Sequence, residues 1–275
     1  MRHIGGASEE HAAAVAASVD VEAIRASGVA VGCAGGAGPA AELLLERLEC
    51  GNGTGRCDVF LHLDADGDRL QLSDERGKAL DAELTFPLAL LATEPAAVVK
   101  GADTSRIVDV LTRARGATLR TVPPGELHLF RALASSGGDL AGEGNGGVIV
   151  PRVGLARDGL AAAAAIIALL VRRGASLSAL VAELPRFAQR RSAVPCLEPA
   201  HARERLQAVG RGLGIEAVDP RVGVQLESRN GAWGLVRLSA TEPVLRITAE
   251  GRTAPEADAL HAELQSMVLD GDPLS

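Results

Sequence analysis

Short apolar runs alternate with helical segments in the middle of the chain, and this alternation constrains the fold more than any other feature. Strands are expected at residues 97–100, 118–122 and 148–150, and helices between them at residues 105–114 and 126–135. Strands that are separated by helices of this length form parallel βαβ units with right-handed crossovers. The pattern therefore predicts an α/β domain with a largely parallel sheet.

Past residue 184 the order of the expected elements changes. Residues 185–199 contain three prolines, which predict a linker. A helix at residues 201–209 then precedes three expected strands and a last helix, at residues 222–226, 233–237, 245–249 and 255–268. Strands that follow one another without intervening helices favour an antiparallel sheet, so this part predicts a small α+β domain.

The first 85 residues predict a shorter α/β unit. Its expected helices and strands lie at residues 7–17, 30–33, 40–48, 59–63 and 70–72. A turn at residues 74–77 predicts that the strand at 70–72 forms a hairpin with the residues that follow the turn.

The composition excludes several classes of partner. Hydrophobic residues make up 47% of the chain but aromatic residues only 2%, so the cores must be built from Ala, Leu and Val. A net charge of −7 implies no basic surface, and few rings are available for base stacking, which argues against a nucleic-acid partner. The length of 275 residues fits two or three small domains.

Neither a membrane segment nor a cysteine-based site is expected. The longest apolar run, at residues 159–171, is too short to span a bilayer, and the N-terminus shows no signal peptide. The four cysteines form no CxxC pair and no zinc-type spacing. The expectation is a cytoplasmic protein without a membrane partner.

Three aspartates at alternate positions follow the apolar run at residues 59–63. The carboxylates of Asp64, Asp66 and Asp68 can converge on one cation if the backbone curls, and Gly67 permits the curl because it lacks a Cβ. Magnesium prefers carboxylate and phosphate oxygens, so the run predicts a magnesium site at the end of a strand. The alternative is a calcium-like or purely structural acidic turn, although the later glutamate of an EF-hand loop is missing.

Three separated motifs follow one another along the chain. They are Asp-Ala-Asp-Gly-Asp-Arg at residues 64–69, Gly-Glu-Gly-Asn-Gly-Gly at 142–147 with Arg-Asp-Gly at 157–159, and Arg-Leu-Ser-Ala-Thr-Glu-Pro at 237–243. Together they resemble the α-D-phosphohexomutases, the family of phosphoglucomutase, phosphomannomutase and phosphoglucosamine mutase. The resemblance covers nearly the whole chain.

The resemblance implies two phosphohexomutase-type α/β domains, the first of them shortened, followed by a small α+β domain with an antiparallel sheet. Residues 1–85 resemble the family's second domain, residues 86–190 the third, and residues 197–275 the fourth. The family's first domain carries a phosphorylated serine, and no loop of this sequence matches it; Ser8 is only a superficial candidate. The path across residues 50–58 is also shorter than in the family.

The same resemblance implies site residues. Asp64, Asp66 and Asp68 would hold magnesium beside the phosphoserine oxygen, and the metal would polarise the transferring phosphoryl group. Arg69 would neutralise phosphate charge, and the other substrate-binding residues would be Glu143 and Asn145, which hydrogen-bond sugar hydroxyls, and Arg157. A plain glycine-rich turn is the alternative for residues 142–147, and Asp158 is equally expected as the N-cap of the following helix.

A phosphate-binding loop is implied at the third motif. Its donors would be the guanidinium groups and hydroxyls of Arg237, Ser239, Thr241 and Arg246. The family prefers Pro where Leu238 stands and Gly or Asn where Ala240 stands, and a simple strand turn is the alternative.

Two hypotheses of function follow from the resemblance. The first is a phosphohexomutase that moves phosphate between the C6 and C1 oxygens of a hexose phosphate; without the phosphoserine domain it would not be competent alone, and a separate chain would supply that serine. The second is a non-catalytic sugar-phosphate-binding or regulatory pseudoenzyme. A truncated gene product is a third alternative. A lost domain would expose an interface, so self-association into a homo-oligomer is also expected.

Overall fold

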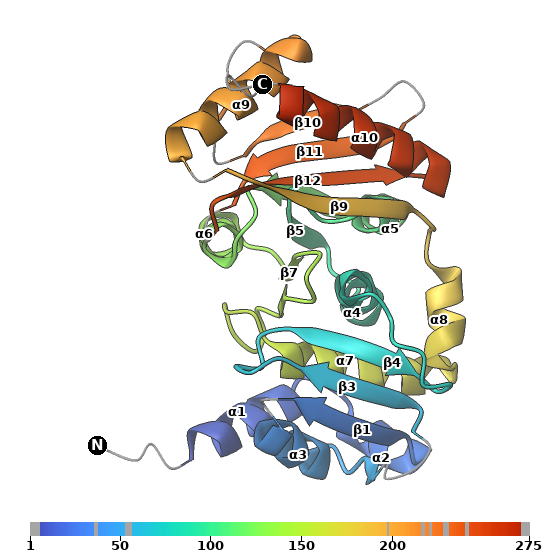
Figure 1. Cartoon of the computed structure of the whole chain (residues 1–275). Coiled ribbons are helices and arrows are strands. Elements are labelled where there is room, and N and C mark those ends of the chain that lie inside the picture. The colour runs from blue at the N-terminus through green and yellow to red at the C-terminus, as the bar shows by residue number, and fades with distance from the viewer. Residues whose placement is uncertain are drawn as a thin grey trace. The chain divides into compact units, whose positions relative to one another are not determined.

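The structure is a computed structural model that describes residues 6–35, 38–52, 57–196, 198–215, 218–219, 222–227, 231–239 and 242–270. The chain forms two compact units, Met1–Pro185 and Arg186–Ser275. The first unit contains two four-stranded sheets and the second contains one (Figure 1). The expected division of the first unit near residue 85 remains a prediction.

The first sheet of the first unit has the order β2-β1-β3-β4. Its strands are β2 (Gly51–Asn52), β1 (Ala30–Gly35), β3 (Val59–Leu63) and β4 (Leu70–Asp74). β1 is parallel to both β2 and β3, whereas β4 runs antiparallel to β3 along its whole length. The hairpin expected after β4 is short: Ser73 and Ala79 form an isolated bridge, and the N–H of Leu80 donates to the carbonyl of Leu72 at 2.8 Å. Along its length β4 pairs with β3, the strand that precedes it. The aspartate run is therefore the connection between two paired strands.

The side chains of β3 alternate between buried and half-buried positions, which shows which face of this sheet is covered. Val59, Leu61 and Leu63 of β3 are buried, while the residues between them are half-buried. The helix α7 (Gly159–Arg173) contacts β3 and β4, and it also contacts α1 (Ala7–Ala16) and α2 (Val21–Ser27). A further helix, α3 (Gly38–Arg47), contacts α1 and β1. The N-terminal helices and α7 thus enclose one core with β3 and β4.

The second sheet of the first unit has the order β6-β5-β7-β8. Its strands are β6 (Thr118–Val122), β5 (Ala97–Gly101), β7 (Leu140–Gly142) and β8 (Val148–Ile149). β5, β6 and β7 are parallel and β8 is antiparallel, which confirms the α/β class and the parallel pairing. The three-residue strand β7 was missing from the sequence prediction, because a run so short carries no readable periodicity.

Helices cover both faces of the second sheet. The helix α6 (Glu126–Ser136) packs on one face in a core that includes Val99, Leu129 and Ile149. The helices α4 (Thr85–Thr93) and α5 (Ile107–Ala114) contact each other, and they contact β7 and β6, respectively. The short turn η1 (Ala82–Leu84) leads into α4.

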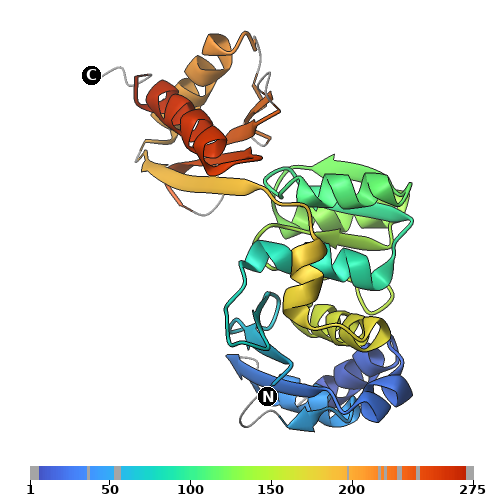
Figure 2. The same ribbon diagram turned by 90° about the vertical axis from the view of Figure 1, so that its right-hand side faces the viewer.

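The helix α7 is buried on nearly all sides, as its run of Ala, Ile and Leu predicts. Gly174 ends it in the left-handed conformation, and α8 (Leu177–Glu183) follows (Figure 2). Among the described residues no single helix is long and apolar enough to cross a membrane; α7 and α8 pass that test only as a pair, across a 90° bend.

The second unit is an antiparallel sheet with two helices on one face (Figures 1 and 2). Its strands, in the order β10-β11-β12-β9, are Val224–Glu227, Trp233–Leu238, Val244–Gly251 and Ala188–Pro195, and its helices are α9 (Pro199–Gly212) and α10 (Ala254–Asp270). Their apolar faces form a core around Leu206, Val236 and Leu264. The α+β class with an antiparallel sheet is confirmed.

The prediction of a linker at residues 185–199 is wrong. Residues Ala188–Pro195 form β9, which pairs with β12 over eight positions. β9 is an edge strand whose side chains are mostly half-buried or exposed, so arginines and a terminal proline are tolerated there. The same residues therefore resemble a linker in the sequence.

Candidate functional site

The aspartate loop lies between β3 and β4 in the first unit. Asp64, Asp66 and Asp68 each offer a carboxylate oxygen, and these oxygens lie within 4.8 Å of one another. The backbone N–H of Arg69 donates to Oδ1 of Asp64 at 3.1 Å. Gly67 has φ of 75°, in the left-handed region that glycine adopts without strain. The loop curls as the sequence predicts and brings the three carboxylates together.

Asp64 and Asp68 differ in their pKa values. Burial and the close Asp64 carboxyl raise the pKa of Asp68 to about 6, although the nearby Arg157 guanidinium acts in the opposite direction. Burial also acts to raise the pKa of Asp64, but contact with Asp68 and the N–H and guanidinium of Arg69 outweigh it, so the pKa is lowered. Asp68 is therefore the weaker acid of the pair, and Asp64 is the stronger one.

The donor set of this loop fits a hard cation. Oδ1 of Asp68 is buried and accepts no hydrogen bond from the described residues; Nε of Arg69 lies 3.7 Å away as an ion-pair contact. A buried acceptor without a hydrogen bond is costly unless a cation or a proton satisfies it. Three convergent carboxylates are the ligands that magnesium prefers. Asp64, Asp66 and Asp68 are therefore the residues that would hold the metal.

The glycine-rich loop follows β7 and lies beside the aspartate loop. The carbonyl of Gly146 accepts a hydrogen bond from the N–H of Leu70, at 3.1 Å, and Gly147 forms a bridge with Arg69. Gly146 has φ of 88°, and a Cβ on it would lie 2.4 Å from the Leu70 carbonyl oxygen. Only glycine allows this approach, so residues 142–147 are more than a plain turn: they dock on the start of β4.

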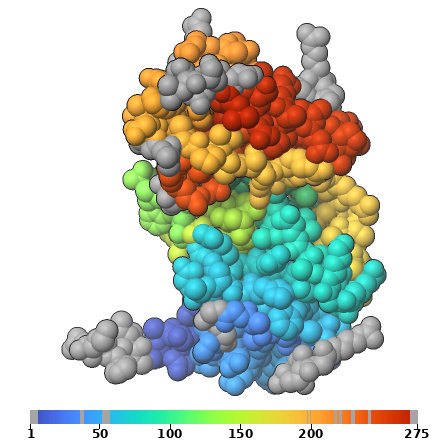
Figure 3. All heavy atoms as spheres, in the orientation of Figure 1, coloured from blue at the N-terminus to red at the C-terminus, as the bar shows by residue number. Residues whose placement is uncertain are grey.

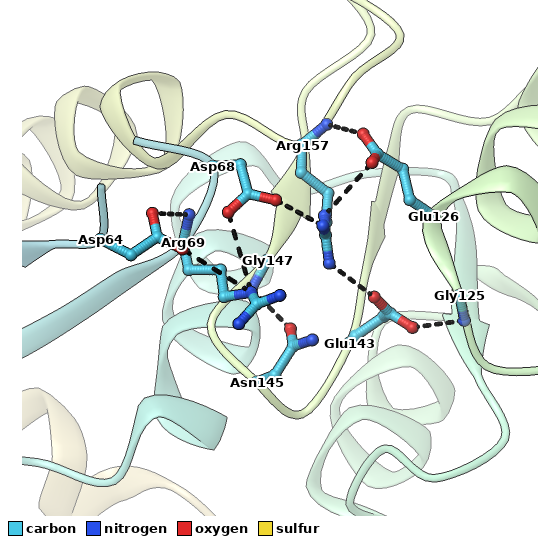
Figure 4. A network of polar contacts seen from close by, with 9 residues as sticks. All are labelled: Asp64, Asp68, Arg69, Gly125, Glu126, Glu143, Asn145, Gly147 and Arg157. Carbon is cyan, nitrogen blue, oxygen red and sulfur yellow. Dashed lines mark hydrogen bonds and ion pairs between the residues drawn. The ribbon is translucent and has the colours of Figure 1, made fainter. Parts of the chain in front are cut away.

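Two polar side chains of this loop were expected to bind a sugar. Glu143 is buried; its Oε1 accepts a hydrogen bond from the N–H of Gly125 at 2.6 Å. Oδ1 of Asn145 accepts from the N–H of Gly147 at 3.0 Å, which leaves its amide nitrogen directed away from that contact (Figure 4). Each of these two side chains is thus held by a backbone group of its own neighbourhood.

Arg157 lies at the centre of the polar network (Figure 4). Its guanidinium forms ion pairs with Asp68, with Glu143 at 3.3 Å and with Glu126 at 3.6 Å, and its backbone N–H donates to Glu126 at 2.9 Å. The Arg157 side chain is 13% exposed, so these pairs are only weakly screened by solvent. One guanidinium thus joins the aspartate loop, the glycine-rich loop and the start of α6.

Glu126 was missed in the sequence, although a signal existed. Glu126 follows β6 and Glu143 follows β7, and both strands are parallel to β5. The carboxyl ends of parallel strands meet at one edge of a sheet, which is where ligands bind in α/β proteins. A search for carboxylates just past each expected strand would have included Glu126.

Asp158 is the N-cap of α7, which is one of the two roles that the sequence predicts for it. Its Oδ1 accepts a hydrogen bond from the N–H of Ala161 at 2.9 Å. Its Oδ2 lies 3.1 Å from Nε2 of His11, on α1. His11 was not singled out in the sequence, because it lies in an Ala-rich helix far along the chain from Asp158 and carries no motif of its own.

The expected phosphate-binding residues lie at the β11–β12 end of the second unit. Arg237 and Arg246 are opposite each other in the antiparallel register, and Arg246 pairs with Glu242. The N–H of Ser239 donates to the carbonyl of Val244 at 3.0 Å. Arg237, Ser239 and Arg246 are thus brought to one strand connection, while Thr241 lies outside the described residues.

Comparison with known proteins shows what this chain is similar to. Residues 86–187 match the family description "Phosphoglucomutase/phosphomannomutase, alpha/beta/alpha domain III", and residues 176–266 match "Phosphoglucomutase/phosphomannomutase, C-terminal domain". A probable phosphoglucosamine mutase of Methanothermobacter thermautotrophicus is 32% identical over 81% of this chain and 50% of its own length. A phosphoglucomutase/phosphomannomutase of Thermococcus kodakarensis is 32% identical over 73% of this chain and 44% of its own length. The chain spans about half the length of the curated relatives it matches.

Solved structures share the fold at lower identity. A phosphoglucomutase/phosphomannomutase family protein from Burkholderia thailandensis has a TM-score of 0.74 and 21% identity, over 96% of this chain and 63% of that one. The N-acetylphosphoglucosamine mutase of Aspergillus fumigatus, solved in complex with GlcNAc-6P and magnesium, has a TM-score of 0.67 and 16% identity, over 96% of this chain and 64% of that one.

Proposed function

The chain belongs to the phosphohexomutase family, and from this premise we propose that it binds a hexose phosphate and takes part in phosphoryl transfer on it. The observation that carries the proposal is the Arg157 network, which joins a magnesium-type aspartate loop to a sugar-type glycine-rich loop. Phosphoryl transfer needs both a cation and a positioned sugar at one place.

Each part of the network has a task in this proposal. Glu143 and Asn145 accept from and donate to the hydroxyls of the sugar, which fixes its orientation. Arg69 neutralises charge on the phosphate, and Arg157 keeps the carboxylates of both loops in place. Magnesium, when bound by Asp64, Asp66 and Asp68, supplies Lewis-acid polarisation of the phosphoryl group. The Aspergillus mutase, solved with GlcNAc-6P and magnesium, supports this choice of ligands.

The second unit contributes a phosphate site in the same proposal. Arg237, Ser239 and Arg246 supply two guanidinium groups and a hydroxyl at one strand connection, and Thr241 is the proposed fourth member. This set suits a phosphate group, because guanidinium forks match phosphate oxygens.

We further propose that these 275 residues do not complete a mutase cycle by themselves. No loop in the sequence matches the family's phosphoserine loop, and a mutase cycle needs a covalent carrier that takes the phosphate back from the bisphosphate as well as donating it. The serine would come from another polypeptide or from sequence beyond these residues.

A second candidate function is a sugar-phosphate-binding protein without catalysis. It is favoured by the ion pair of Arg157 with Asp68, since a guanidinium there competes with the metal for a ligand oxygen. The changes at Leu238 and Ala240, relative to the family pattern, also favour it.

One pair of measurements tests the proposed function and the proposed incompetence of the chain alone. The chain is assayed for interconversion of hexose 6- and 1-phosphates of glucose, mannose and glucosamine, with magnesium and a catalytic amount of hexose bisphosphate, and calorimetry measures binding of the same sugars. Binding without turnover supports the proposed incompetence of the chain alone. Turnover by the isolated chain contradicts that incompetence and also the non-catalytic candidate, and absence of both binding and turnover contradicts the proposed function.

A further inference from the structure

A histidine–carboxylate pair lies beside the aspartate loop and has no role in the function proposed above. Nε2 of His11 is 3.1 Å from Oδ2 of Asp158, and the side chains are 42% and 13% exposed, respectively. The helix that carries His11, α1, lies at the surface of the first unit, where its blue atoms are visible in Figure 3. The imidazole is therefore both held by a partner and open to a ligand.

The pair borders a pocket that reaches the aspartate loop. The pocket has a volume of about 350 Å³ and is lined by His11, Asp66, Gly67, Arg157 and Asp158, among others. Backbone contacts fix this geometry, because the N–H of Gly159 donates to the carbonyl of Gly67 at 2.9 Å. His11 and a proposed metal ligand thus share one cavity.

The contact with Asp158 decides which ring nitrogen of His11 is reactive. A carboxylate accepts hydrogen bonds, so Nε2 carries the proton in this contact, and Nδ1 of a neutral ring keeps its lone pair. A ring nitrogen without a proton cannot donate a hydrogen bond to an anionic oxygen, but its lone pair can attack an electrophilic atom. An adjacent carboxylate also stabilises the positive charge that develops on a ring that reacts at Nδ1.

Metal ligation by His11 is a poorer explanation of the pair. Among the described His, Cys, Asp and Glu side chains, only Asp64, Asp66 and Asp68 bring three ligand atoms within 4.8 Å. His11 lies outside this group, so it lines the pocket next to the aspartate loop without adding a ligand to the three carboxylates.

We propose that His11 is a phosphoryl acceptor. Its Nδ1 attacks the phosphorus of a donor of the phosphoramidate or acyl-phosphate class; the bond from phosphorus to the leaving group breaks and a P–N bond forms. In a second step, which rests on the proposed function, a hydroxyl oxygen of a hexose phosphate attacks the same phosphorus. The P–N bond then breaks, a P–O bond forms, and the hydroxyl proton passes to the imidazole. Asp64, Asp66 and Asp68 would hold a magnesium ion that would offset the charge of the phosphoryl group.

The first step is tested by charging the whole chain with potassium phosphoramidate in the presence of magnesium. Phosphoramidate is the probe because one P–N bond replaces another, so charging does not have to run against a large free-energy difference. Intact-mass and peptide mass spectrometry are expected to show one phosphoryl group, labile in acid and stable in alkali, on His11. Absence of this group, or its presence mainly on another residue, overturns the proposal.

Three variants make this test specific. In His11→Gln the amide nitrogen can still donate to Asp158 while the nucleophile is lost, so labelling falls by at least about tenfold. In Asp158→Asn the helix cap is retained but the charge is lost, and labelling slows by about tenfold. The control is His201→Gln in the second unit, which keeps full labelling. Wild-type labelling of His11→Gln, or loss of labelling in His201→Gln, overturns the proposal.

The second step is tested by adding glucosamine 6-phosphate to the charged chain. Loss of the label with formation of a hexose bisphosphate is expected. A label that persists while calorimetry shows the sugar bound contradicts transfer from His11 and leaves the proposed function intact. If the sugar does not bind at all, the proposed function fails, and the charging experiment still decides whether His11 accepts a phosphoryl group.

Discussion

At the scale of single residues, Arg157 sets the charge balance of the candidate site. Its guanidinium faces Asp68, Glu126 and Glu143 at once, so it balances charge that would otherwise repel within and between the loops. Breaking a buried pair is costly because a charge stays behind without a partner. The same guanidinium competes with a cation for Asp68. In the proposed function, the affinity of the aspartate loop for metal and the position of the glycine-rich loop would therefore be linked through one side chain.

Replacing Arg157 by Gln is expected to tighten magnesium binding and to weaken hexose phosphate binding. The competitor for Asp68 is gone, which increases magnesium affinity by about tenfold, the effect of one pairwise charge interaction of ~1.4 kcal/mol. The tether of Glu143 is lost as well, so the sugar binds more weakly. Calorimetry with each ligand measures both effects.

Arg152 provides a matched control for this variant. It is an exposed arginine of the loop that precedes Arg157. Arg152→Gln is expected to leave both affinities unchanged. Equal behaviour of the two variants would show that general charge, and not the network, sets the affinities.

The raised pKa of Asp68 predicts how magnesium binding depends on pH. Its pKa of about 6 lies above the ordinary value, so the carboxyl is protonated below pH 6 and cannot ligate. Magnesium affinity is expected to fall by about tenfold between pH 7 and pH 5, following the protonated fraction. In the metal-free chain, Asp68 makes folding stability change with pH in the opposite direction. The folded state holds the proton of Asp68 more tightly than the unfolded state, so the contribution of Asp68 to the free energy of unfolding is lost as the pH rises through 6.

Asp68→Asn tests this assignment. The variant lacks the titrating group, so its weaker magnesium affinity is expected to be nearly constant from pH 5 to pH 7. A wild-type affinity that does not change over this range, or a variant that keeps the full change, would assign the pH dependence to another group.

At the scale of elements, the sequence predicts those that carry a strong periodicity and misses those defined by their partners. The strand at residues 118–122 is found at its predicted bounds, and the helix expected at 126–135 is α6 within one residue. β9 was mistaken for a linker, because an edge strand can be rich in Arg and Pro. The aspartates and Arg157 belong to readable motifs, whereas the contact of His11 with Asp158 exists only after α1 packs near α7.

Gly146 offers a test of the docking between the glycine-rich loop and β4. Gly146 and Gly116 both have a positive φ, of 88° and 67°, so an alanine costs about 1 kcal/mol of backbone strain at either position. A Cβ at Gly146 would in addition lie 2.4 Å from the Leu70 carbonyl oxygen, whereas at Gly116 nothing lies within 4 Å. Gly146→Ala is therefore expected to lower the free energy of unfolding by clearly more than Gly116→Ala, and only Gly146→Ala should weaken sugar binding. Urea unfolding and calorimetry measure the two effects; equal losses would refute the docking.

At the scale of the whole molecule, the chain consists of two units with cores of their own. The second unit buries Leu206, Val236 and Leu264 between its sheet and its two helices. Its edge strand β9 lies close to the boundary at residue 186 and pairs with β12 along its full length. The ability of this unit to fold by itself is therefore expected to depend on β9, the strand that the sequence pattern predicted to be a linker.

A fragment of residues 186–275 is expected to fold cooperatively without the first unit. A fragment of residues 197–275 lacks β9 and exposes the edge of β12, so it should aggregate or unfold at a much lower urea concentration. Circular dichroism and urea unfolding compare the two fragments. Equal stability would mean that β9 contributes little, and an unfolded longer fragment would mean that the second unit depends on the first.

The central claim is that the aspartate loop and the glycine-rich loop form one site for a metal and a hexose phosphate. The most direct measurement is the affinity of the whole chain for glucosamine 6-phosphate by calorimetry, with magnesium and with EDTA. Binding is expected to be at least about fivefold tighter with magnesium, which is the lower range of coupling between linked ligands, and Asp66→Asn is expected to lose this difference. Equal affinity with and without magnesium would show that the two loops do not form one site.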